Sequence, residues 1–299
     1  MRTLFRQRRF PHISGIALAS IVVALLLGGA SAAEDLLEFP DPSVVRLLTV
    51  GAVLTEDETT GATVLDGIVA EFEAQTGYDV VVTQGNIDIF DQARFGGADI
   101  VMAHLGFTPL HDFVVKRIGE WPATILSNSV AFLIPPGDPA GVASAADPYE
   151  AFQSIAAHEA PFVVNNLGET LYVTDVLYEA AGRPDPGNWF IDLGQQGPPA
   201  VRAAAQRGGY TLWGLHPFLN LQRSPMPVNL EAVVFDDSIM QRILATVVVR
   251  RPFLLVNHEG ATAFQEHLTR PATQAQIRAF RVPEVDGPIF WPAGNQNDN

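Results

Sequence analysis

The sequence contains no cysteine and few basic residues. The absence of cysteine excludes disulfides, thiolate zinc sites, iron–sulfur clusters and cysteine nucleophiles together. The 18 Lys and Arg residues face 33 Asp and Glu residues, and the net charge of −15 disfavours a nucleic-acid partner, because a polyanion is held by clustered basic side chains. With 47% apolar and only 17% charged residues, the chain is not a disordered acidic tail. Its 299 residues suffice for one large or two medium lobes with a real core.

Residues 1–32 have the pattern of an export signal. Arginines without any acidic residue precede an apolar run at 15–29, which is shorter than the roughly 20 residues that span a bilayer. Ala30-Ser31-Ala32 matches a cleavage site, so we favour a cleaved signal peptide over a membrane anchor, and Arg8-Arg9 leaves the twin-arginine route open. Cleavage removes four basic residues and leaves 14 against 33 acidic ones, a net charge of −19. We expect the mature protein in the periplasm.

Apolar strands alternate with helical patterns in the first half of the mature chain. Strands are predicted at 46–50, 79–83 and 98–103, with a helix that starts near Val64 and ends before Gly77. This order is typical of parallel βαβ units. In such sheets ligands bind beyond the carboxyl ends of the strands.

The remainder of the chain continues the mixed pattern. We predict further strands at 130–135, 161–165, 210–212, 233–235, 246–249 and 253–256. Helices are predicted near 147–157, 173–181, 199–207, 262–268 and 273–280. Two α/β lobes with the chain crossing between them are the simplest architecture for this pattern.

Short segments spread over residues 46–295 occur in the order of a known family. They are 70–79 (AEFEAQTGYD), 96–100 (GGADI), His104, Asn128, 137–140, 180–182, 189–190, 210–212, 256–257, 264–268 (FQEHL) and 288–292 (PIFWP). With them the chain resembles the extracytoplasmic solute-binding component of tungstate-type ABC transporters. The resemblance implies an α/β fold, the two-lobed type II periplasmic-binding-protein-like fold with a hinge between the lobes.

The same resemblance implies the division of the chain. After the signal peptide at 1–32, we expect residues 33–129 to form the first part of lobe 1. Residues 130–254 then form lobe 2, and residues 255–299 return to lobe 1. Closure is expected about strands near 130–135 and 253–256.

The segments that match the family's ligand loops have changed. The first loop, a Thr/Ser-rich run in the family, is Thr55-Glu56-Asp57-Glu58-Thr59 here, and the arginine of the third loop has become Val164. A carboxylate about 4 Å from a bound dianion costs roughly 4 kcal/mol per unit charge at an effective dielectric of 20, about three decades of affinity. The ligand is therefore expected not to be a simple tungstate or molybdate ion, unless these acidic residues face solvent on a first helical turn.

We take as candidate ligand residues those in or beside the matching loops: Thr55, Glu56, Thr59, Gly85, Asn86, His104, Asn128, Asn166, Thr170 and Trp213. Amides, including Asn165, and an aromatic face suit a neutral or cationic organic solute, although a buried tryptophan is more often core. A metal site from Glu56, Asp57, His104 and Glu169 is a weaker alternative, because no close histidine pair supports it. We expect no metal and no cofactor.

These features favour a monomeric receptor that captures a small ligand between its lobes and delivers it to an ABC permease in the inner membrane. A sensory or partner-binding protein on the same scaffold is the alternative. An enzyme is not expected, because no nucleophile elbow, P-loop, dinucleotide fingerprint or metalloprotease helix is present, and no catalytic residue is assigned.

Overall fold

The computed structural model describes residues 41–85, 88–250 and 256–294, and from Pro42 onward these belong to one compact unit. The predicted signal peptide at 1–32, Asn86 and most of the predicted strand at 253–256 lie outside the described residues. Within the described ranges, no helix has the length and apolar character needed to cross a membrane.

The strands follow the buried apolar runs of the sequence. They are β1 (Val44–Thr49), β2 (Asp79–Gln84), β3 (Ile100–His104), β4 (Ala123–Ile134), β5 (Phe162–Val163), β6 (Phe190–Ile191), β7 (Thr211–Gly214), β8 (Glu231–Val233), β9 (Gln241–Val248) and β10 (Trp291–Pro292). The twelve residues of β4 make it long enough to take part in two sheets.

The helices are α3 (Val64–Thr76), α4 (Ile89–Arg94), α5 (Thr108–Val115), α6 (Pro148–Ala157), α7 (Gly168–Ala180), α8 (Pro198–Gln206), α9 (Leu215–Gln222), α10 (His258–Leu268) and α11 (Pro271–Ala279), with 3-10 turns η1 (Gly51–Leu54) and η2 (Val142–Ser144). Helix α3 begins at a capping box in which Thr63 and Asp66 exchange hydrogen bonds, and it ends at Gly77 in the left-handed conformation. Helix α7 begins earlier than the predicted 173, so Glu169 and Thr170 lie in its first turn.

The first sheet has the order β10-β4-β9-β3-β1-β2. Strand β1 pairs in parallel with β2 and with β3, which confirms the predicted βαβ units. Strand β9 runs antiparallel between β3 and β4, so that His104 lies opposite Leu244 and Asn128 lies opposite Arg242. The carboxyl ends of β1, β2 and β3 therefore meet at one edge, beside the start of β9.

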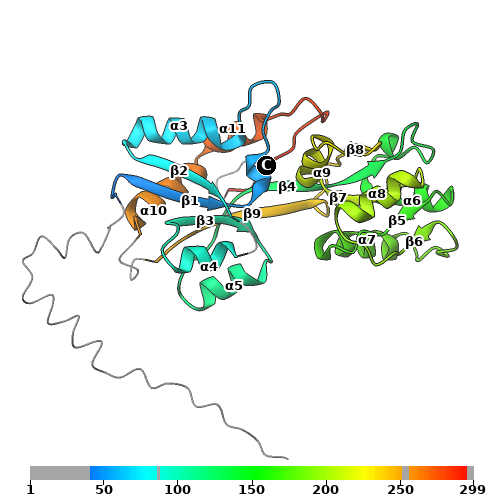
Figure 1. The fold of residues 1–299 in the computed structure, drawn as a ribbon, viewed down its shortest axis with the longest axis horizontal. Helices are drawn as coiled ribbons and strands as arrows, with labels where there is room; N and C mark the ends of the chain where they lie inside the picture. The colour runs from blue at the N-terminus through cyan, green and yellow to red at the C-terminus, as the bar shows by residue number, and fades with distance from the viewer. Residues whose placement is uncertain (1–40, 86–87, 251–255, 295–299) are drawn as a thin grey trace, which may run out of the picture. The chain divides into compact units, whose positions relative to one another are not determined.

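The second group of strands uses the other half of β4. Residues 130–134 of β4 pair antiparallel with β7 and β8, while β5 pairs in parallel with β6 and is bridged to Tyr210. In Figure 1 the labels α6, α7, α8 and α9 lie with this group, and α3, α4, α5, α10 and α11 lie with the first sheet.

Two strands pass between the two groups, as Figure 1 shows for β4 and β9. In β4 the pairing partner changes from β9 to β7 between Ser129 and Val130. The chain returns to the first sheet at Met240, the residue directly before β9. At this point the Val130 N–H donates a hydrogen bond to the Met240 carbonyl. The predicted two-lobed type II fold is confirmed. Within the described residues the chain crosses between the groups at 129–130 and again at 240–241, and most of the predicted hinge strand at 253–256 lies outside the described residues.

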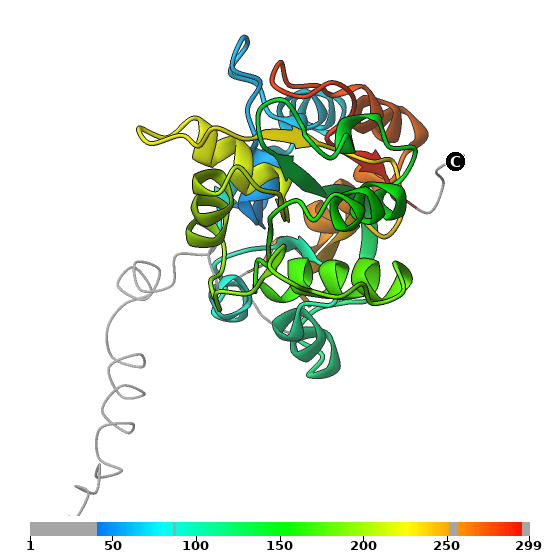
Figure 2. The same cartoon turned by 90° about the vertical axis from the view of Figure 1, so that its right-hand side faces the viewer.

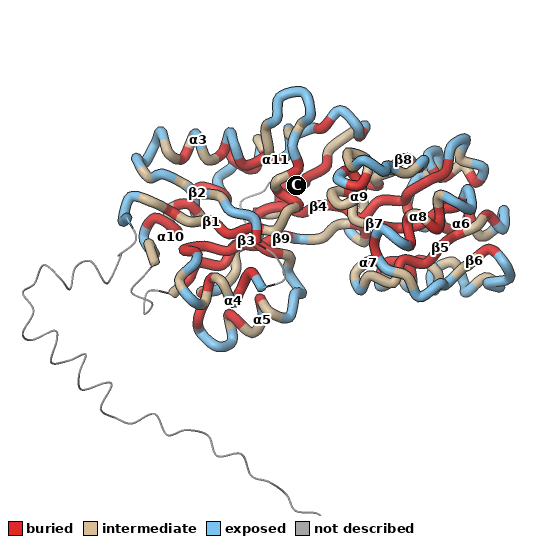
Figure 3. The backbone as a smooth tube through the Cα atoms, in the orientation of Figure 1, coloured by how far each residue is buried: buried red, intermediate tan, exposed pale blue. Residues whose placement is uncertain are grey.

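Three apolar clusters fill the layers. One packs α3, α10 and α11 on one face of the first sheet and extends to α8 and α9, and another packs α4 and α5 on the opposite face. The third fills the second group between β4, α6 and α7. The turned view in Figure 2 looks from the side of this second group. In Figure 3 the tube is red along most of β3 and β4, whose residues are buried from Ile100 to Ala103 and from Ile125 to Ile134.

Candidate functional site

A cavity of about 530 Å³ lies at the carboxyl ends of β1, β2 and β3. Its walls are Val50 after β1, Gly85 after β2, residues 103–107 at the end of β3, and Ile89 of α4. Glu169 in the first turn of α7 and Arg242 in β9 complete the lining. The cavity therefore lies where ligands bind in parallel α/β sheets, and elements from both strand groups line it.

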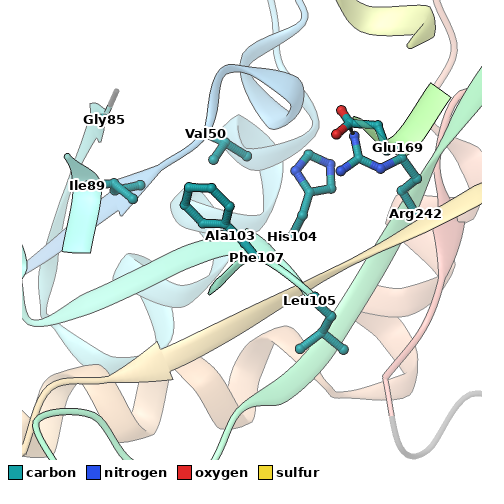
Figure 4. A pocket seen from close by; sticks show the side chains of 10 residues that line it. Val50, Gly85, Ile89, Ala103, His104, Leu105, Phe107, Glu169 and Arg242 are labelled. Atoms are coloured by element: carbon teal, nitrogen blue, oxygen red, sulfur yellow. Dashed lines mark hydrogen bonds and ion pairs between the residues drawn. The ribbon is translucent and has the colours of Figure 1, made fainter. Parts of the chain in front are cut away.

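The charged part of the cavity is an ion pair. Arg242 Nη1 donates to Glu169 Oε1 at 2.6 Å, and both side chains keep contact with solvent. Burial lowers the pKa of Arg242 from its usual value, while the charge and hydrogen bond of Glu169 oppose that shift. In Figure 4 the two side chains point toward each other and the imidazole of His104 lies beside them.

His104 contributes a polar but uncharged group. Its Nε2 lies 3.3 Å from Asn128 Oδ1, and burial, followed by the charge of Arg242, lowers the pKa of His104 to about 4. The ring is neutral at pH 7, so one ring nitrogen donates a hydrogen bond and the other accepts one. His104 can therefore orient a ligand without attracting it by charge.

The rest of the wall is apolar. Val50, Ile89 and Phe107 lie on the side of the cavity away from the ion pair (Figure 4). Gly85 lets Ile89 stay in this wall, because a Cβ on residue 85 would lie 2.5 Å from Ile89 Cγ1. One part of the cavity thus holds charge, and another offers hydrocarbon contact.

The first predicted ligand loop does not line this cavity. Thr55 is buried, where its Oγ1 donates to the Ala52 carbonyl and contacts His216 Nδ1. Glu56 and Thr59 are exposed, and the Thr59 N–H donates to Asp57 Oδ1.

Glu58 of the same loop pairs with Arg223 at 3.0 Å. Arg223 also binds Glu284 and donates to the Glu56 carbonyl. The Glu58 carboxylate and the Glu56 carbonyl are therefore used in a contact between the loop and the end of α9.

Some of the other candidate ligand residues lie at the cavity, and others contact or are buried in the surrounding structure. Gly85 and His104 line the cavity, and Asn128 binds His104. Asn166 donates to Asp192 Oδ1, and Thr170 and Trp213 are buried in the surrounding structure.

Asn165, whose amide the sequence also offered to a ligand, is fully buried. Its Nδ2 donates to the Leu212 carbonyl and its Oδ1 accepts from the Leu167 and Gly197 N–H groups, so its bonds serve the fold.

Arg242 is the residue that the sequence did not single out. Its only signal is a basic residue at the start of an apolar strand, which is common in proteins of any function. Although Val164 replaces the arginine of the family's third loop, β9 brings another arginine, Arg242, into the wall of the cavity.

The alternative metal set of Glu56, Asp57, His104 and Glu169 is not assembled. Within the described part of the chain, no three His, Asp or Glu side chains converge in a way that could hold a metal ion.

The fold and the position of the cavity define a type II periplasmic-binding-protein-like protein. No family model matches the sequence. The tungstate-binding protein TupA of Peptoclostridium acidaminophilum is 21% identical over 288 residues, covering 94% of this chain and 98% of that protein. A putative ABC transporter anion-binding protein of Haloferax volcanii is 27% identical over 249 residues, covering 81% and 70%.

Among solved structures, the tungstate-binding protein TupA of Desulfovibrio alaskensis G20 matches with a TM-score of 0.63 and 24% identity, covering 84% of this chain and 99% of that one. The predicted resemblance to tungstate-type solute-binding proteins is thus confirmed. These relatives are binding proteins by name.

Proposed function

We propose that this chain is a periplasmic solute-binding receptor that captures a small solute in the cavity and delivers it to an ABC permease in the inner membrane. The observation that carries the proposal is the position of the cavity. It lies at the carboxyl ends of three parallel strands and faces the first turn of α7, with the β4 and β9 crossings next to it. One relative named as a tungstate-binding protein and another named as a putative ABC transporter anion-binding protein support it.

Movement about the two crossings would open and close the cavity. The strands cross at 129–130 and 240–241, and β9 carries Arg242 immediately after the second crossing. A solute that contacts both sides favours the closed state, and a permease then recognises the closed form. This mechanism needs no chemical reaction. It also fits the export predicted from residues 1–32.

The solute we propose is not a bare tungstate or molybdate ion. Glu169 holds its carboxylate on the arginine that lines the cavity. A dianion at this position would lie about 4 Å from that carboxylate and lose roughly 4 kcal/mol per unit charge, about three decades of affinity. The apolar wall would in addition remain without a partner.

A thermal-shift screen of residues 33–299 tests the receptor function. It should cover oxyanions, divalent metals, amino acids, polyamines and sugars, because a ligand of the native state raises the melting temperature. We expect saturable stabilisation by an organic solute and none by tungstate. Stabilisation by no solute would refute the receptor, whereas saturable stabilisation by tungstate would refute only the exclusion of the oxyanion.

A matched pair of glycine variants tests the location. Gly85→Ala places a Cβ 2.5 Å from Ile89 Cγ1 and pushes that side chain, so it should weaken solute binding at least about 10-fold. In Gly67→Ala the new Cβ meets Gln276 Oε1 at an ordinary 3.5 Å in α3, so affinity should stay unchanged. Equal effects in both variants would place the site elsewhere.

A further inference from the structure

We propose that the cavity selects a small zwitterionic organic solute, whose carboxylate binds Arg242 and whose ammonium group binds Glu169, with its apolar part against Val50, Ile89 and Phe107. The inference rests on the proposed function and names the class of its ligand. An amino acid with an apolar side chain has this chemistry.

The two charges belong to different parts of the fold. Glu169 is in α7, which packs on β7 in the second strand group, whereas Arg242 is in β9, opposite Asn128 in the first sheet. They meet across the cavity at 2.6 Å. Movement about the crossings would separate the two side chains. A ligand with both charges could then form one ion pair with Arg242 and another with Glu169, in place of the pair between them.

Both groups retain capacity for a ligand. Their mutual bond uses Nη1 of Arg242 and Oε1 of Glu169, and the described residues supply no further hydrogen bond to Nη2, Nε or Oε2. The side chains are 25% and 40% exposed, so a solute can reach them. A guanidinium binds a carboxylate through two parallel hydrogen bonds, and a carboxylate accepts from an ammonium group.

The charge balance selects the net charge of the ligand. Arg242 and Glu169 cancel each other, and the neutral ring of His104 adds no charge. A zwitterion satisfies both members and leaves no buried charge unpaired, whereas an inorganic dianion leaves Glu169 repelled and an amine alone leaves Arg242 unpaired.

The size and walls of the cavity indicate an organic body. A volume of about 530 Å³ lies within the range of roughly 300–1,000 Å³ for small-molecule sites. The apolar wall of Val50, Ile89 and Phe107 lies on the side of the same cavity away from the charged pair and suits a hydrocarbon side chain (Figure 4). Glycine, which lacks one, should therefore bind more weakly than leucine.

Titration calorimetry on residues 33–299 can test each charge with ligand analogues. We would compare L-leucine, L-phenylalanine, L-methionine and L-valine with glycine, 4-methylpentanoate, 3-methylbutylamine and tungstate. At least one of the four apolar amino acids should bind. 4-Methylpentanoate and 3-methylbutylamine, which lack the ammonium and the carboxylate of leucine, should each bind about 10- to 100-fold more weakly than the best amino acid. This series uses the unmodified protein, so it does not depend on the folding of a variant.

Two variants assign the charges to residues. Glu169→Gln should remove most of the preference for the amino acid over the monocarboxylate, while the matched Glu58→Gln should keep it. A monocarboxylate that binds the unmodified protein as tightly as the amino acid, or tungstate binding without any amino-acid binding, would overturn this inference and leave the receptor function standing. Absence of binding by every solute in the wider screen would overturn the receptor function itself.

Discussion

Two clusters of similar composition lie in this protein and differ in their surroundings. The cavity cluster comprises His104, Asn128, Glu169 and Arg242, and the loop cluster comprises Thr55, Glu58, His216 and Arg223. Each contains one arginine, one glutamate and one histidine whose pKa burial lowers to about 4.

The difference between them is the space around the charges. The cavity cluster has one carboxylate for its arginine and faces a cavity with apolar walls. In the loop cluster Nε and Nη2 of Arg223 bind Glu58, Glu284 and a backbone carbonyl, so both of these groups are used within the chain. The residue types in the candidate site and in the structural contact are the same here, and only the space around them differs.

The largest expected effect concerns pH and involves both clusters. His104 and His216 titrate near 6.5 when unfolded and near 4 when folded, so as pH falls the unfolded chain takes up protons first. Their contribution to stability is complete above pH 6.5 and is lost as pH falls from 6.5 toward 4. We expect a loss of about 2 kcal/mol per histidine after allowance for solvent exposure.

Urea unfolding at pH 7.5, 5.5 and 4.5 measures this loss. His104→Gln and His216→Gln should each remove about half of the pH-dependent loss of unfolding free energy that these two histidines cause together. An unchanged pH dependence in both variants would show that other groups carry the acid sensitivity.

Arginine substitution separates the clusters by affinity. Arg242→Gln removes the proposed charged partner of the solute and should weaken solute binding about 100-fold, because a bond to a charged group is worth about 1.5–3 kcal/mol. Arg223→Gln should change affinity less than about 3-fold and lower stability by about 1 kcal/mol. Calorimetric titration of both variants with the best solute measures the two affinities. The prediction is contradicted if Arg223→Gln binds the solute more weakly than Arg242→Gln does.

Thr55→Val tests the loop cluster as a structural contact. It removes the buried hydroxyl that bonds Ala52 and contacts His216, so the free energy of unfolding should fall by about 1–2 kcal/mol. Solute affinity should remain the same, since Thr55 does not line the cavity. A large loss of solute affinity with unchanged stability would indicate that this loop contacts the ligand.

The smallest effect is expected for the exposed residues of the predicted ligand loop. Glu56→Gln combined with Thr59→Ala should change solute affinity less than about 2-fold and stability less than about 0.5 kcal/mol, because both side chains point to solvent. Thermal-shift titration against the unmodified chain measures both quantities. A tenfold change in affinity would contradict the placement of the site.

The sequence alone was sufficient for features that depend on local pattern. The βαβ order of β1, β2 and β3 follows from apolar periodicity. Gly85 and His104, which line the cavity, became candidates because their segments match those of the family that the chain resembles. The family order of short segments also predicted the two-lobed fold with a hinge.

Only the tertiary structure brought Arg242 to the site. Strand β9 inserts between β3 and β4, and this pairing places Leu244 opposite His104 and Arg242 opposite Asn128, far apart in the sequence. Helix α7 then brings Glu169 to the same point. Strand order and register depend on the packing of the whole sheet, so no local pattern around residue 242 could show which carboxylate it meets or whether a cavity lies beside it.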